Sequence, residues 1–170
     1  GTMWGGKIRF DTPMLFALGF ITMFMIGGFT GIMHSSVPID AQHQDTYFVV
    51  AHFHYVLIGG ALFGLYSGFY YWLPKMSGRL LNDKLGKLVF SMMFIGFNLT
   101  FFPMHYLGMI GQPRRTHSYN EGHGFETWNQ IATIGAFILG VGVLIGIYQF
   151  VSAFFNKKLK PAGKNPWKAN

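Results

Sequence analysis

Four long apolar stretches dominate the pattern of hydrophobic and polar positions along the chain. They run from Met14 to Met33, from Phe48 to Leu73, from Leu88 to Ile110 and from Ile131 to Phe155. None of them contains Lys, Arg, Asp or Glu, and each is close to the ~20 residues that a helix needs to cross a bilayer. The pattern therefore predicts an all-α integral membrane protein with four transmembrane helices.

Local signals set the ends of these helices, which we place at about residues 13–34, 47–74, 87–110 and 127–156. The first begins in the segment FDTPMLF, where Asp11 or Thr12 is a suitable N-cap and Pro13 falls in the first turn. The second is expected to end at YYWLPK, an aromatic belt closed by Pro74. The sequence shows no internal repeat.

Charge supports a membrane protein and gives its orientation. The chain is 51% hydrophobic and 11% charged, against about 25% charged residues in ordinary soluble domains. If the helices alternate in direction, eleven of the thirteen basic residues lie on the side of the termini: Lys7, Arg9, Lys75, Arg79, Lys84, Lys87, Lys157, Lys158, Lys160, Lys164 and Lys168. This asymmetry predicts cytoplasmic (or matrix-side) termini. It also explains the net charge of +7 without a nucleic-acid partner.

The segment VVAHFHYVLIGG places His52 and His54 two positions apart inside the second apolar stretch. On a strand the two side chains would share a face and could chelate one metal ion. On a helix, which the length of the stretch favours, they lie about 200° apart and face different partners. Hydrogen bonding to neighbouring helices is one interpretation. We favour the other, two metal or haem centres flanking the helix, because ionisable groups within a membrane usually mark functional sites.

The sequence around this pair resembles subunit I of the haem-copper oxidases, the catalytic subunit of cytochrome c oxidases. The resemblance rests on DTYFVVAHFHYVL and, in the family's order, on MWGG, ALGF, FIGFNLTFFPMHYLGM, QPRR and TWN. It covers nearly the whole chain. It implies that the four helices are the last four of a twelve-helix bundle, so that residues 1–170 are the C-terminal part of a single membrane domain.

The resemblance implies a role for each histidine of the pair. His52 matches the proximal ligand of the high-spin haem, where oxygen is reduced, and is therefore the catalytic residue expected in this chain. His54 matches one of two axial ligands of the low-spin haem. The pair would hold two haems of the A type, one on each face of the helix. No ligand spacing is recognised for His34, His105, His117 and His123.

The outer loops carry polar residues that the family places near the haems. Arg114 and Arg115 match arginines that bind haem propionates by charge-assisted hydrogen bonds, and Asp40 matches an acid near the propionates of the high-spin haem. Asp45 matches an acid that helps to bind a redox-inactive magnesium ion. Gln44 stands where the family usually has a histidine ligand, so either its amide oxygen serves magnesium or the site is altered or empty.

The resemblance also implies a function for the whole complex: a terminal respiratory oxidase that reduces O2 to water with electrons from cytochrome c and translocates protons. The family's copper ligands lie upstream of these residues, so this chain alone is expected to be inactive. The expected partners are the remainder of subunit I, the copper-carrying subunit II, subunit III, cytochrome c and lipid. The expected location is a bacterial cytoplasmic membrane rather than the mitochondrial inner membrane.

Two alternatives stay open at this point. A quinol oxidase would share the fold, because another subunit selects the electron donor. A non-catalytic membrane interaction module could retain the sequence without haem. The residues also do not distinguish a C-terminal fragment of subunit I from half of a split subunit.

Overall fold

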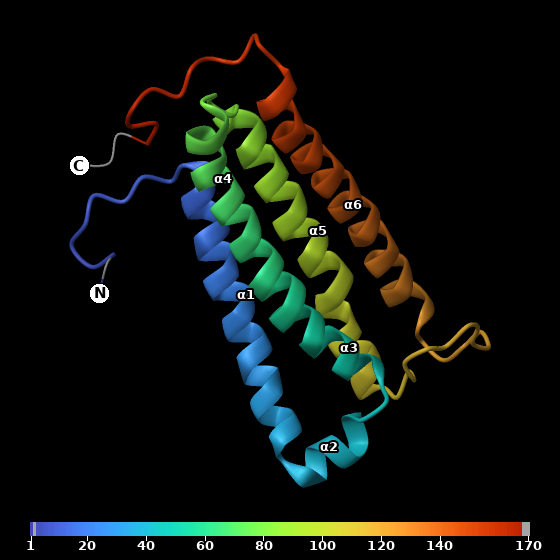
Figure 1. The fold of residues 1–170 in the computed structure, drawn as a ribbon. Coiled ribbons are helices and arrows are strands. Elements are labelled where there is room, and N and C mark those ends of the chain that lie inside the picture. Colours follow the sequence, from blue (N-terminus) through green and yellow to red (C-terminus); the bar gives the residue numbers. More distant parts are fainter. Residues whose placement is uncertain (2, 168–170) are drawn as a thin grey trace.

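The structure is a computed structural model that describes residues 1 and 3–167. All named elements of secondary structure in these residues are helices. Long helices lie side by side with both chain ends at one end of the bundle (Figure 1). The elements are α1 (Thr12–Ser35), α2 (Val37–His43), α3 (Tyr47–His54), the π-helix η1 (Tyr55–Leu62), α4 (Phe63–Ser77), α5 (Asp83–Met109) and α6 (Glu126–Phe155).

Four of the described helices are long and apolar enough to cross a membrane. They are α1, the continuous α3–η1–α4 segment Tyr47–Ser77, α5 and α6. The predicted all-α membrane class with four spanning helices is therefore confirmed. Short α2 and the loop between α5 and α6 lie at the end of the bundle opposite the chain ends (Figure 1).

Two helix ends differ from the sequence prediction. The second span continues through Pro74 to Ser77 and stops at Gly78, which has a left-handed backbone with φ 71°. The third span begins at Asp83 rather than near residue 87. Asn82 accounts for this earlier start, because its Oδ1 accepts the N–H groups of the first turn. Polar capping residues lie outside the apolar stretch, so a count of apolar positions misses the turn that they stabilise.

Hydrogen bonds between polar groups join the spans at the end where the chain termini lie, and Thr12, Tyr70 and Gln149 among them are buried. The backbone N–H and the hydroxyl of Thr12 both donate to Asp83 Oδ1, at 2.9 and 2.8 Å. Tyr70 donates to Gln149 Oε1 at 2.8 Å, and Gln149 Nε2 donates to the Asn82 carbonyl at 2.7 Å. Each of these groups would be costly to bury alone in a bilayer, so the bonds fix how α1, α4, α5 and α6 meet.

The apolar core lies between α1, α4 and α5 and is mostly aromatic. Its fully or almost fully buried members are Phe16, Met23, Tyr55, Phe63, Tyr66, Tyr70, Val89, Met93 and Phe97. Helix α6 packs on the far side of α5, as Figure 1 shows. Its outer face is apolar and exposed over Phe137, Leu144 and Phe155. Such a face requires lipid or further protein around it.

Candidate functional site

Helix α3 carries the histidine pair and is set by a capping residue at its start. The Thr46 hydroxyl accepts the Phe48 N–H at 3.2 Å and donates to the His43 carbonyl at 2.6 Å. His52 faces α1, and His54 faces α5, where its ring stacks on Phe101 with centroids 4.1 Å apart. The helix thus presents its two imidazoles to different neighbours, as the 200° separation predicts.

The contacts of His52 define which ring nitrogen carries the proton. Thr30 Oγ1 lies 2.9 Å from His52 Nδ1 and also 2.9 Å from the Gly27 carbonyl oxygen. A hydroxyl has one hydrogen, and two oxygen atoms this close need that hydrogen between them. Thr30 therefore donates to Gly27 and accepts from the His52 Nδ1–H. The lone pair of the imidazole is left on Nε2.

His54 has the same assignment for a simpler reason. Its Nδ1 lies 2.8 Å from the Val50 carbonyl oxygen, which can only accept, so Nδ1 carries the hydrogen and Nε2 the lone pair. A neutral imidazole whose other nitrogen donates to a fixed acceptor is the usual form of a metal-ligating histidine. Both side chains therefore fit axial ligation of a haem iron through Nε2.

A cavity of about 360 Å³ opens beside His52, between α2 and α3. It is lined by His34, Asp40, Gln44, Asp45, Val49, His52 and Arg114. Five of the residues that the sequence singled out thus meet in one place. His54 and Arg115 are not among the lining residues.

Backbone contacts between residues 45–47, at the start of α3, and the loop that joins α5 to α6 bring Arg114 to this cavity. The Tyr47 N–H donates to the Gln112 carbonyl at 3.0 Å, and the Arg114 N–H donates to the Asp45 carbonyl at 2.9 Å. Gln112 is buried and accepts from Asn129 Nδ2 at 3.0 Å, which ties the loop to α6. These bonds hold the second loop against the start of α3.

Arg114 and Asp45 form an ion pair within the cavity. The Arg114 side chain is 33% exposed, and its Nε is buried without a partner among the described residues. A buried, unpaired guanidinium N–H is a donor for a further anion, which fits a haem propionate. Arg115 is not among the residues that line this cavity; it is exposed and has a left-handed backbone with φ 62°.

The donors for magnesium fit less well. The Asp45 carboxylate is already paired with the Arg114 guanidinium, and Gln44 is an exposed residue at the end of α2. Among residues 1 and 3–167, no three His, Cys, Asp or Glu side chains gather closely enough to hold a metal ion. A cation at Asp45 would have to compete with the arginine. Magnesium therefore stays a prediction of the sequence resemblance.

Sequence reasoning missed the contribution of α1 to the site. His34 lines the cavity, its Nδ1 lies 3.4 Å from Asp40 Oδ1, and its ring is 5.1 Å from that of His52. Thr30 and Gly31 contact His52 from the same helix. The signal was available, because positions 27, 30, 31 and 34 share one helical face.

These features define a class: a four-span helical membrane protein with two ligand-competent imidazoles on opposite sides of one helix. A family model described as "Cytochrome C and Quinol oxidase polypeptide I" matches residues 1–138. The chain therefore belongs to this family, subunit I of the haem-copper oxidases, and the resemblance is confirmed. Membership implies haem and copper in the complete complex.

Curated relatives carry both kinds of oxidase name. Cytochrome c oxidase subunit 1 of Synechocystis sp. is 52% identical over 99% of this chain, and that of Bacillus sp. (strain PS3) is 53% identical over 88%. Quinol oxidase subunit 1 of Bacillus subtilis (strain 168) is 50% identical over 90% of this chain. The chain spans 30%, 24% and 24% of these relatives, respectively.

A solved structure supports the fold independently. It is a cryo-EM structure of a heme-copper terminal oxidase dimer, and it covers 88% of this chain with a TM-score of 0.76 and 22% identity. This chain corresponds to 28% of that subunit. At this identity the likeness extends to the helical arrangement alone.

Proposed function

We propose that the chain is the haem-binding C-terminal part of subunit I of a bacterial cytochrome c oxidase, which reduces O2 to water and translocates protons. The observation that carries the proposal is the histidine pair, in which each Nδ1 is engaged and each Nε2 lone pair is free for a metal. Bound haems would supply electron transfer and oxygen reduction. The chain itself would supply ligation, orientation and fixed charge.

Each histidine has its own task in this proposal. His52, held from α1, is the ligand of the high-spin haem, and His54, packed on α5, is one ligand of the low-spin haem. The second ligand of the low-spin haem and the copper ligands would come from the remainder of subunit I. Subunits II and III and cytochrome c would complete the system, and this chain alone would be inactive.

The outer cavity would receive negatively charged haem propionates. Arg114 supplies a buried, unpaired Nε–H for them, and Asp40, bonded to His34, lies at the same cavity. Arg115 adds positive charge nearby from an exposed position. Fixed positive charge favours the reduced haem, because reduction adds an electron close to the guanidinium.

Substitution of Arg114 by Met should lower at least one haem midpoint potential while iron ligation keeps the haems bound. The change removes a partly buried positive charge and leaves the charge of Asp45 uncompensated, so the site becomes more negative. Arg115→Met is the matched comparison and should shift the potential less, because Arg115 is exposed and outside the cavity. Redox titrations measure both. Unchanged midpoints in Arg114→Met would contradict the propionate assignment.

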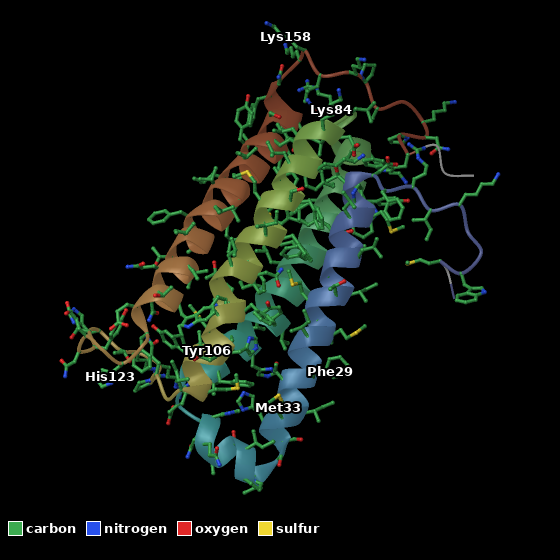
Figure 2. The ribbon with its side chains drawn as sticks, turned by 180° about the vertical axis from the view of Figure 1, so that it is seen from behind. Phe29, Met33, Lys84, Tyr106, His123 and Lys158 are labelled. Atoms are coloured by element: carbon green, nitrogen blue, oxygen red, sulfur yellow. The ribbon has the colours of Figure 1, made fainter. Side chains whose placement is uncertain are left out.

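Both termini would face the cytoplasm. Lys84 and Lys158 lie at the end of the bundle that holds the chain ends, whereas His123 lies at the opposite end (Figure 2). Of the basic residues on which the sequence argument rests, Lys168 lies outside the described residues. Protease added outside sealed right-side-out vesicles should spare the Lys157–Lys164 tail, and cleavage there would reverse the orientation.

The electron donor distinguishes the proposed enzyme from its alternatives. The purified complex containing this chain should consume O2 with reduced cytochrome c and not with a quinol alone, and its absorption spectrum should show haem A. The identities of 52% and 50% to relatives of the two kinds do not separate them, so the assay decides. Oxidation of quinol alone would identify a quinol oxidase. A complex without haem would leave a membrane interaction module.

A further inference from the structure

Two neighbouring residues of α1, Thr30 and Gly31, lie against the His52 imidazole. Thr30 Oγ1 accepts from the ring Nδ1–H at 2.9 Å and donates to the Gly27 carbonyl, with the Ile26 carbonyl 3.3 Å away. At Gly31 a Cβ atom would lie 2.9 Å from His52 Cε1 and 3.6 Å from Nε2. Thr30 thus supplies a hydrogen-bond acceptor for the His52 ring, and Gly31, which has no side chain, leaves space for it.

The hydrogen bond from Nδ1 affects the opposite nitrogen. An acceptor on the Nδ1–H makes the imidazole a stronger donor through Nε2 and fixes the ring about its own axis. The Thr30 oxygen suits this task, because its own hydrogen is committed to a helix carbonyl and chains of hydrogen bonds strengthen one another. Residues in such positions around metal ligands typically change activity about 10–100-fold when they are removed.

We propose that Thr30 is a positioning residue for the high-spin haem ligand: its hydroxyl orients the His52 imidazole and strengthens the bond that Nε2 makes to iron. Gly31 leaves the ring the space for that orientation. The inference rests on the proposed function, in which His52 holds the iron. In this proposal α1 contributes no iron ligand. Through Thr30, however, it affects the strength of the bond between His52 and the iron of the high-spin haem.

The test compares three variants of the intact complex. Thr30→Val keeps the shape and loses the acceptor, Thr30→Ser keeps the hydroxyl, and Thr22→Val removes an exposed hydroxyl of the same helix that bonds only its own backbone at Leu18. In Thr30→Val the iron–histidine stretching band of the reduced high-spin haem should move to lower wavenumber, and its midpoint potential should rise. Turnover should fall about tenfold. Thr30→Ser and Thr22→Val should match the wild type.

The outcomes separate this inference from the proposed function. An unchanged stretching band and midpoint in Thr30→Val, with the high-spin haem still lost in His52→Ala, overturns the role of Thr30 alone. A high-spin haem that survives His52→Ala overturns both. If the Thr30→Val complex is too unstable for spectroscopy, Thr30→Ser decides. A wild-type band in Thr30→Ser supports the inference. A band displaced from the wild-type position, although the hydroxyl is still present, would mean that side-chain volume and not the hydroxyl matters, and it would overturn the inference.

Discussion

Replacement of His54 by alanine is expected to remove the low-spin haem signal from the assembled complex and to leave the high-spin haem in place. His54 faces α5 and stacks on Phe101, whereas His52 faces α1. The loss of the His54 imidazole therefore leaves His52 and its hydrogen-bond partner Thr30 intact. Absorption spectra of the reduced complex, with and without carbon monoxide, measure the two haems separately, because only the high-spin iron has an open position for that gas.

His52→Ala should give the reverse pattern, with loss of the carbon monoxide-binding haem and retention of most of the low-spin signal. His123→Ala is the control, since His123 lies in the exposed outer loop against Phe125. Imidazole added to a His52→Gly variant should restore part of the high-spin signal. Such rescue would show that the haem was lost because its ligand was missing and not because the protein misfolded. Both haems surviving in both variants, or the same haem lost in each, would refute the assignment.

Gly135→Ala is expected to destabilise the packing of α6 on α5 strongly. A Cβ at Gly135 would lie 2.6 Å from the Thr100 nitrogen and 2.7 Å from the Leu99 carbonyl carbon. These are backbone atoms, so no side-chain rotation can relieve the overlap and the helices must separate. Overpacking of this kind costs about 1–3 kcal/mol and occasionally more. The temperature at which the solubilised complex loses its haem spectrum should fall.

The same helix provides a matched control. At Gly140 a Cβ would meet no atom of residues 1 and 3–167 within 4 Å, and alanine favours a helix over glycine by about 1 kcal/mol. Gly140→Ala should therefore leave the thermal midpoint unchanged or raise it slightly. Equal midpoints for the two alanine variants would show that α5 and α6 do not approach each other this closely in the complex.

The spans and the divergence of the histidine pair were accessible from sequence because they follow from short-range rules. Apolar length predicts a membrane helix, and 100° per residue predicts that His52 and His54 face opposite ways. The short helix α2 and the π-helix η1 were not predicted. Helix α2 lies in a polar segment without a long apolar period, and η1 begins directly after His54 inside a uniformly apolar stretch, where periodicity carries no information.

The outer site depends on contacts between loops that are far apart in the sequence. Asp45 adopts a left-handed backbone with φ 56°, and its carbonyl and side chain both bind Arg114. The sequence suggested separate roles for these two residues, magnesium for Asp45 and propionates for Arg114. Only the folded chain reveals that they are partners. The hydrogen bonds that Asp83 accepts from Thr12, which join the start of α5 to α1, escaped prediction for the same reason.

The number and spin state of the haems in the wild-type complex show whether His52 and His54 each hold a haem. Haem extracted from the purified complex should amount to two haems A for each copy of this chain, since each Nε2 lone pair serves one iron. Electron paramagnetic resonance of the oxidised complex should show a low-spin iron, and carbon monoxide should bind one haem in two after reduction. One haem per chain, or two haems that are both low-spin and closed to carbon monoxide, would contradict the account.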